Sequence, residues 1–150
     1  MKNQQLAQLN IARMKGVDMN DPIMIDFVAQ LDEVNGLAES SAGFVWRLKD
    51  DSGNATNFNP FDDVQLIVNM SVWENMEALE HFVFNGLHLE VMRRRREWFQ
   101  RFGIAFMVLW WVPEGHKPTL EEANERLDYL QTHGATTYAF DFRNKFEPKD

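Results

Sequence analysis

One predicted helix carries the side chains best suited to chemistry. Five of them follow one another at steps of three and four residues and so share one helix face: His88, Met92, Arg95, Phe99 and Phe102. Because this face is mostly apolar, we expect it to point inward. A neutral imidazole there can transfer a proton near physiological pH, and a guanidinium can bind a carboxylate or a phenolate through two hydrogen bonds.

The two polar candidates on this helix also have structural interpretations. His88 could equally be a hydrogen-bonded core residue, and Arg95 could pair with a buried or interfacial carboxylate. The consecutive arginines Arg93–Arg96 sweep most of the helix circumference, so they cannot all face one cavity. Basic helices on acidic proteins usually form salt bridges on their own surface or in a dimer. An anionic ligand or an acidic partner is the alternative.

Further candidates lie on a strand and at the start of the next helix. Asn10 lies on the strand face opposite to Leu9 and Ile11, so it could line a cavity as an amide donor or be solvated. Trp73, where a strand meets a helix, is either a packing anchor or a platform for a substrate. The side chains that we predict to contact a substrate are Trp73, Phe82, Met92 and Phe99.

Composition excludes several classes of protein. The chain has no cysteine, which excludes thiol nucleophiles, cysteine-ligated zinc and iron–sulfur clusters. Its eight glycines occur singly, so there is no phosphate-binding loop or dinucleotide fingerprint, and no nucleophile elbow is present. The four histidines show no close ligand spacing, so we expect no metal. We also expect no other cofactor. The net charge of −8 argues against nucleic acid as a partner.

Two features bear on where the protein resides. Residues 1–5 lead into a polar, alternating segment rather than the apolar run of a signal peptide. The longest apolar stretch, residues 104–113, is about half the length that a membrane helix needs. We therefore expect a cytoplasmic protein with no membrane partner.

The elements that must position these side chains follow the order βαββαβ. Four segments alternate in polarity or are continuously apolar, as strands are: residues 5–13, 44–48, 64–72 and 104–112. Three segments repeat apolar residues every three or four positions, as helices do: residues 21–40, 74–85 and 87–102. Two right-handed split units of this kind give an α+β fold, a ferredoxin-like four-stranded antiparallel sheet with helices on one face.

The C-terminal part adds to this arrangement. Residues 119–122 form a capping box that begins a further helix, which ends at Gly134. Alternating aromatic residues within 136–146 then predict an extra strand, which we expect to dock at the sheet edge near a subunit boundary. Residues 1–115 would form the α+β barrel domain, and residues 116–150 a helix–strand extension of the same domain.

A sheet covered on one side only leaves its other face open. That face would hold large rings, among them Trp46 and one of the pair Trp110 and Trp111, and monomers rarely expose such a patch. We therefore predict a homodimer in which two sheets pair face to face as a dimeric α+β barrel with a cavity in each subunit. The alternative is a monomer in which the C-terminal helix covers the sheet.

The chain resembles a known group of folds. Ser71–Leu79, followed by Phe82 and His88, resembles the antibiotic biosynthesis monooxygenase-like superfamily of dimeric α+β barrels. The whole chain looks more specifically like an uncharacterised bacterial family of that group, catalogued as a domain of unknown function, and Glu90–Phe99 and Leu109–Pro113 are its distinctive segments. Because this fold hosts monooxygenases, haem-degrading enzymes, dehydratases and simple binders, the resemblance informs the fold more than the chemistry.

Residues and resemblance together favour one function. It is a small-molecule enzyme, a cofactor-independent monooxygenase or a related lyase, acting on a hydrophobic or aromatic substrate in the cavity. Asn10 and His88 would orient or deprotonate the substrate, and Arg95 would stabilise the anionic charge that develops. The alternative is a non-enzymatic protein that binds an apolar acid or a haem-like ligand. Haem-degrading relatives resemble the chain at Asn10 and His88, but Phe82 stands where they carry a tryptophan.

Overall fold

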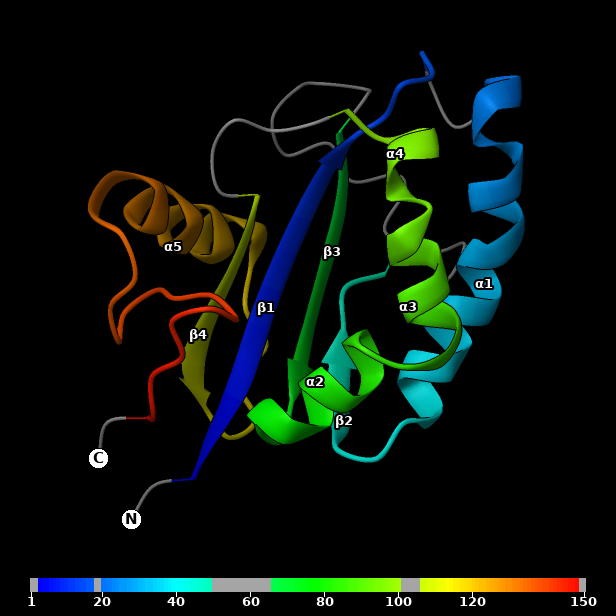
Figure 1. Cartoon of the computed structure of the whole chain (residues 1–150). Coiled ribbons are helices and arrows are strands. Elements are labelled where there is room, and N and C mark those ends of the chain that lie inside the picture. The colour runs from blue at the N-terminus through cyan, green and yellow to red at the C-terminus, as the bar shows by residue number, and fades with distance from the viewer. Residues whose placement is uncertain (1–2, 18–19, 50–65, 101–105, 149–150) are drawn as a thin grey trace.

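In a computed structural model, the protein consists of one antiparallel sheet with helices on both of its faces (Figure 1). The structure describes residues 3–17, 20–49, 66–100 and 106–148. The strands lie in the order β2-β3-β1-β4, and each neighbouring pair is antiparallel. They are β1 (Gln4–Arg13), β2 (Phe44–Arg47), β3 (Leu66–Trp73) and β4 (Met107–Pro113). The fold class is therefore α+β, as the sequence predicts.

The helices follow the predicted order, but the predicted helix 87–102 is divided into two shorter helices. They are the 3-10 helix η1 (Pro22–Met24), α1 (Ile25–Ser40), α2 (Met76–Val83), α3 (Gly86–Arg93), α4 (Arg95–Trp98) and α5 (Leu120–His133). Side-chain oxygens of Asp21, Asn75 and Thr119 accept the first free backbone N–H groups of η1, α2 and α5. No helix among the described residues is long and apolar enough to cross a membrane.

The predicted helix 87–102 is interrupted at Arg94. This residue has φ −92° and ψ 4°, and Phe99 after α4 is already extended. The guanidinium of Arg94 pairs with Glu97 at 2.8 Å and with Asp26 of α1 at 3.1 Å. The interruption turns Trp98 into a small buried cluster with two methionines, where it is 1% exposed. Burial of this large ring favours the turn over a continuous helix.

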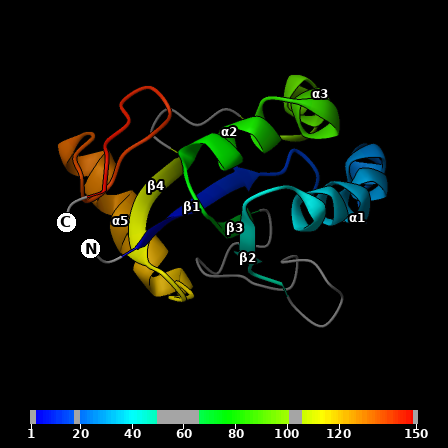
Figure 2. The ribbon, with the colours of Figure 1, turned by 90° about the horizontal axis from the view of Figure 1, so that it is seen from below.

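α5 packs on the apolar face of the sheet, mainly along β4 and β1 (Figure 2). Ala123, Leu127 and Leu130 of this helix pack on strand residues that all point to the same side. The indole N–H of Trp110 also donates to the Glu122 carboxylate at the start of α5, at 2.8 Å. The buried strand residues of this face are Ala7, Leu9, Ile11, Val68, Met70, Val72, Val108, Trp110 and Val112.

This cover bears on the predicted homodimer. The homodimer was predicted because the apolar face of the sheet would be open in one subunit. Within the single chain, however, Trp110 is 0% and Met70 is 1% exposed. The arrangement is the one that the sequence offered as the alternative, with the C-terminal helix on the sheet. Hydrophobic burial therefore gives no support to a dimer formed through this face, and the homodimer stays a prediction from the sequence.

The C-terminal tail, residues 135–148, docks on its own chain. The extra strand predicted there is reduced to one bridge, in which Phe140 exchanges two backbone hydrogen bonds with Leu109 at the free edge of β4, at 2.8 and 2.9 Å. The Asp141 carboxylate then accepts the backbone N–H groups of Arg143 and Asn144, at 3.0 and 2.8 Å. This turn ends the extended conformation after one pair.

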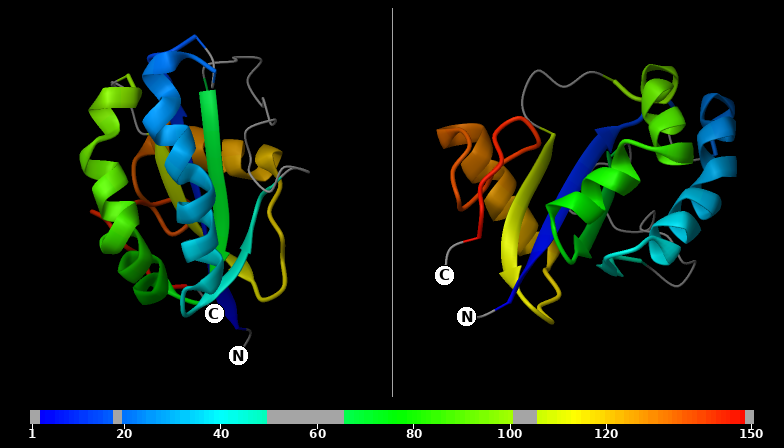
Figure 3. Two further views of the ribbon diagram at one scale, coloured as in Figure 1. Left: turned by 90° about the vertical axis from the view of Figure 1, so that its right-hand side faces the viewer. Right: turned by 60° about the horizontal axis from the view of Figure 1, so that its bottom comes forward.

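α1, α2 and α3 lie over the opposite face, with α1 and α3 next to each other (Figure 3). One end of this face is apolar: Leu6, Trp73 and Leu109 are buried against Leu79 of α2. Its middle is polar, because Gln8 and Asn10 of β1 stand there. The two ends of the same face therefore offer the helices different surfaces.

A glycine sets how closely α2 approaches the turn before β2. Gly43 has φ 83°, and a Cβ built on it would lie 2.4 Å from the Ala78 Cβ. We expect Gly43→Ala to destabilise the protein by about 2–4 kcal/mol, through the left-handed backbone and the clash together. Urea unfolding monitored by circular dichroism measures this.

The matched control for this prediction is Gly36→Ala. Gly36 lies on the exposed side of α1 with nothing within 4 Å of an added Cβ, so alanine there should stabilise the protein by roughly 0.5–1 kcal/mol. If Gly43→Ala stabilises the protein as Gly36→Ala does, the close approach at Gly43 is wrong.

Candidate functional site

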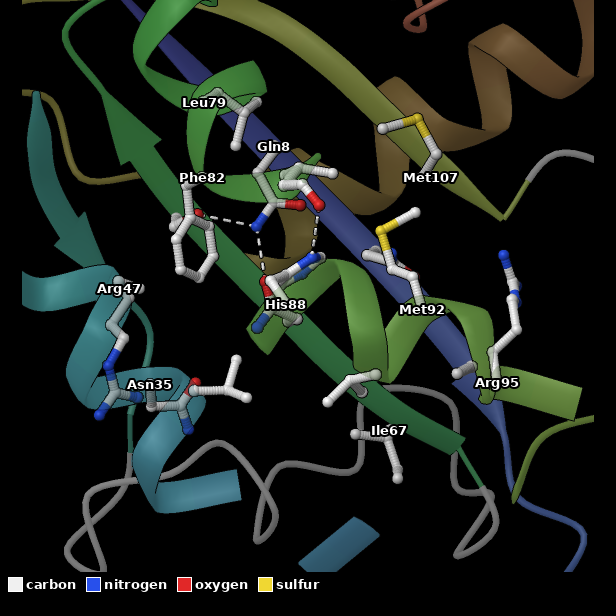
Figure 4. A pocket seen from close by; sticks show the side chains of 18 of the residues that line it. Gln8, Asn35, Arg47, Ile67, Leu79, Phe82, His88, Met92, Arg95 and Met107 are labelled. Carbon is white, nitrogen blue, oxygen red and sulfur yellow. Dashed lines mark hydrogen bonds between the residues drawn. The ribbon is translucent and has the colours of Figure 1, made fainter. Parts of the chain in front are cut away.

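A cavity of about 280 Å³ lies between the polar middle of the sheet and helices α1, α2 and α3 (Figure 4). β1 and β3 form its floor, α1 forms one wall, and α2 with α3 forms the other. Its volume is near the lower end of the range for small-molecule sites, about 300–1,000 Å³. The walls are mainly aliphatic and aromatic side chains, among them Leu31, Val34, Phe82 and Met92.

The floor of the cavity is a hydrogen-bonded row of polar side chains. In the β1–β3 register Gln8 is opposite Ser71, and Asn10 is opposite Asn69. The Gln8 amide donates to Asn69 Oδ1 at 2.6 Å and to Ser71 Oγ at 2.8 Å, and the Trp73 indole donates to the same hydroxyl at 2.9 Å. Within the described residues the Asn10 amide has no such partner, so its donors and its acceptor remain available to a ligand.

His88 lines the cavity as a neutral imidazole. Its Nδ1 donates to the Val83 carbonyl at 3.0 Å, and its ring packs on Phe82, which stacks on Trp73. Burial lowers the pKa of His88 below its ordinary value of 6.5, and the weaker opposing effect is the hydrogen bond to Val83. Because Nδ1 carries the proton, the lone pair is on Nε2, which has no hydrogen-bond partner among the described residues. Nε2 is thus a candidate base.

Arg95 lines the same cavity about two helical turns further along the chain. Its guanidinium lies 4.4 Å from the centre of the Phe106 ring. Desolvation first, and then the charge of Arg96, lower the pKa of Arg95 from its ordinary value, although a guanidinium stays protonated at neutral pH. No carboxylate pairs with it among the described residues, so the ion pair considered for it from the sequence is not present there.

The charges around the cavity favour an anion. Of the described residues that line it, none is Asp or Glu. Arg47 reaches it from β2 but is paired with Glu39 at 2.8 Å. Of the arginine run, Arg95 lines the cavity, whereas Arg94 pairs with acidic residues and Arg93 and Arg96 are exposed. In Figure 4 Arg47 and Arg95 stand at opposite ends of the group, with His88 between them.

The structure places all the predicted site residues around this one cavity. They are Asn10, Trp73, Phe82, His88, Met92, Arg95 and Phe99. Phe102, which the helix face also predicted, lies outside the described residues. No group of three His, Asp, Glu or Cys that could hold a metal ion occurs among the residues that the structure describes.

Several polar and aromatic lining residues were not predicted from the sequence, among them Asn69, Ser71, Arg47 and Phe142. Asn69 and Ser71 interrupt an otherwise apolar strand at alternate positions, and that interruption was a usable signal. Their contact with Gln8 and Asn10 depends on the register between strands that are far apart in the sequence. Arg47 and Phe142 reach the cavity from β2 and from the tail, and no local pattern indicates this.

Comparison with known sequences finds one family. The family described as Domain of unknown function (DUF3291) matches residues 5–150. No curated protein matches the chain.

Similar solved structures share the fold at low sequence identity. A Pseudomonas aeruginosa protein is 12% identical and aligns over 77% of this chain and 99% of its own, with a TM-score of 0.51. A conserved protein from Methanosarcina mazei is 7% identical over 73% and 92%, with a TM-score of 0.52. SnoaB from Streptomyces nogalater, a cofactor-independent oxygenase, is 15% identical over 79% and 99%, with a TM-score of 0.44. At these identities the similarity concerns the fold alone.

The buried neutral His88 should make stability depend on pH. Its pKa is about 6.5 in the unfolded chain and lower in the folded protein, so the unfolded chain binds more protons between these two values. The contribution of His88 to the free energy of unfolding should be fully present above about pH 6.5. It should decrease as the pH falls toward the folded pKa of His88 and change no further below that pKa. Melting temperatures between about pH 5 and 8 measure this.

The control compares two histidines. His88→Gln should lose this part of the pH dependence, whereas His81→Gln should keep it, because His81 is exposed on α2. An NMR titration in which the His88 ring protonates at or above about pH 6.5 would contradict the prediction.

Proposed function

We propose that this chain, which belongs to the family Domain of unknown function (DUF3291), binds an aromatic or otherwise apolar acid in the cavity and removes a proton from it. The observation that carries the proposal is the combination of two groups in one apolar space. His88 is a neutral base, and Arg95 is a cation without a carboxylate partner among the described residues. We further propose that proton removal is the first step of a cofactor-independent monooxygenation.

Electrostatics supports an acidic ligand. The protein carries a net charge of −8, yet the described residues that line the cavity include arginines and no carboxylate. A half-buried guanidinium has lost part of its hydration, and an incoming carboxylate or phenolate restores that interaction through charge-assisted hydrogen bonds. The aliphatic and aromatic walls bind the remainder of the molecule by hydrophobic burial.

Geometry supports a conjugated substrate. His88 on α3 and Arg95 at the start of α4 line the same cavity at different points along it. A conjugated aromatic substrate can therefore contact both groups. Charge released when His88 takes a proton at one end can then spread to an oxygen at the Arg95 end, where the guanidinium stabilises it.

The proton step uses the hydrogen bonds already described. His88 Nε2 accepts the proton, and the Nδ1–H bond to the Val83 carbonyl holds the ring in place before and after the transfer. Since the lowered pKa makes His88 a weak base, the substrate proton must itself be acidic. The pairing of the substrate anion with Arg95 supplies that acidity. The Asn10 and Asn69 amides on the floor can donate to a carbonyl or hydroxyl of the substrate.

The oxidation step draws its electrons from the substrate. The carbanion adds dioxygen, and the proton held by His88 returns to form a hydroperoxide. The hydroperoxide then loses water and leaves a carbonyl group. In sum, CH₂ and O₂ give C=O and H₂O, so one oxygen atom enters the product and the other leaves as water.

The alternative function is binding without turnover. His88 also has the arrangement of a metal-ligating histidine, since Nδ1–H donates to a backbone carbonyl and Nε2 is unprotonated. A haem-like ligand is therefore the specific form of this alternative. A Soret band in the purified protein, or one that forms on addition of haemin and is lost in His88→Ala, would favour it over the enzyme.

Binding of an aromatic acid should depend on Arg95. We expect 1-hydroxy-2-naphthoate to bind and Arg95→Ala to raise its dissociation constant by about 10- to 100-fold, the cost of losing a hydrogen bond to a charged group. Arg96→Ala is the matched control, because Arg96 is adjacent and exposed. Titration calorimetry measures both. Equal loss in the two variants would show that only the overall basic charge of the helix matters.

Proton removal should depend on His88. With two- and three-ring phenols and enolisable ketones, we expect solvent deuterium to exchange into the acidic position without dioxygen, and oxygen to be consumed when it is supplied. His88→Ala should abolish both and leave ligand affinity within about threefold, while His81→Ala should change neither. A folded His88→Ala protein with full turnover would remove the proton-transfer role, and ligands that bind without exchange would favour the binding protein.

A further inference from the structure

The C-terminal tail reaches the cavity from the opposite side of the sheet. After α5, which lies on the apolar face, the chain passes the β4 edge and comes to lie beside α2 (Figure 2). There Phe142 joins the lining of the cavity, together with Phe84 and Met107. The sequence predicted a strand at the subunit boundary for this segment, and the proposed function gives it no role.

Phe142 contributes to the wall at the α2 end of the cavity. Its ring meets the Phe84 ring edge to face, with 5.2 Å between their centres and an angle of 69° between their planes. Phe84 follows the last residue of α2, Val83, whose carbonyl holds His88. The aromatic pair therefore lies near the candidate base, at the junction of α2 and α3, whereas Arg95 begins α4.

Contacts on both sides of Phe142 hold it in place. Before it, Phe140 is bridged to Leu109 of β4. After it, the Lys145 ammonium donates to both carboxylate oxygens of Glu80 on α2, at 3.1 and 3.0 Å. The Trp111 indole also donates to the carbonyl of Phe146, at 2.8 Å. A side chain fixed between such anchors presents a defined surface to a ligand.

We propose that Phe142 determines ligand length in this cavity. The ring limits how far an aromatic ligand anchored at Arg95 extends past His88, and so selects two-ring over four-ring acids. This inference rests on the proposed function only in taking the cavity to be a site for aromatic acids. It assigns to the tail a role in specificity that catalysis does not require.

The test compares two acids of different length, 2-naphthoate and 1-pyrenecarboxylate, by titration calorimetry. The quantity is the ratio of the dissociation constant for 1-pyrenecarboxylate to that for 2-naphthoate. We expect the ratio to exceed one in the unaltered protein and to fall by about tenfold or more in Phe142→Ala, because the larger acid gains space and the smaller acid gains nothing. Phe142→Leu, which keeps more of the packing, should shift the ratio in the same direction.

Tyr138→Ala is the matched control. Tyr138 is an aromatic residue of the same tail that packs on Arg126 and Tyr129 and does not line the cavity. Its removal should leave the ratio unchanged. An equal shift in Tyr138→Ala would overturn the inference, because general loosening of the tail would then explain both variants.

The remaining outcomes separate this inference from the proposed function. An unchanged ratio in folded Phe142→Ala and Phe142→Leu, with 2-naphthoate binding still dependent on Arg95, overturns the role of Phe142 and leaves the proposed function standing. If Phe142→Ala does not fold, the ratio in Phe142→Leu decides. Failure of the unaltered protein to bind either acid overturns both, since the cavity is then not a site for aromatic acids.

Discussion

The hydrogen-bond network of Gln8, Asn69, Ser71 and Trp73, in which all but Asn69 are buried, is the constraint on which the site depends. A carboxamide placed under helices costs free energy unless its polar atoms are bonded, and Gln8 is only 7% exposed. The network meets that requirement within the sheet itself. The inward faces of α1 and α3 are mainly apolar, with Asn35 and His88 among the polar exceptions.

The cavity lies over the polar part of the sheet face, beneath helices whose inward side chains are mainly apolar. At the end of the sheet where the floor is apolar, Leu79 of α2 packs closely on Leu6 and Trp73. Over the polar middle, the cavity separates the side chains of α1 and α3 from the amide groups of the sheet. Burial lowers the pKa of His88, and partial burial together with the charge of Arg96 lowers the pKa of Arg95. The alternation of residue types along β1 places the polar floor beneath this cavity.

The sequence predicts the elements well because each has a local cause. Alternation marks β1 and β3, and the three- and four-residue spacing places His88, Met92 and Arg95 on one side of a helix. Features that depend on contacts between segments far apart in the sequence are harder to predict. The periodicity of α5 shows that one side of it is apolar, but not that this side packs on the sheet. The tail fails as a strand because Asp141 bonds its own backbone, a competition that alternation does not reveal.

The stack of Trp73, Phe82 and His88 has a spectroscopic consequence. All five tryptophans lie within the described residues, and Trp73 alone among them lines the cavity. It is 0% exposed, and its indole N–H is held by Ser71. The fluorescence emission of Trp73 therefore reports on a buried environment. Binding of a molecule in the cavity, or protonation of His88, changes the electric field at this indole ring. The protein carries its own optical probe at the place where chemistry would occur.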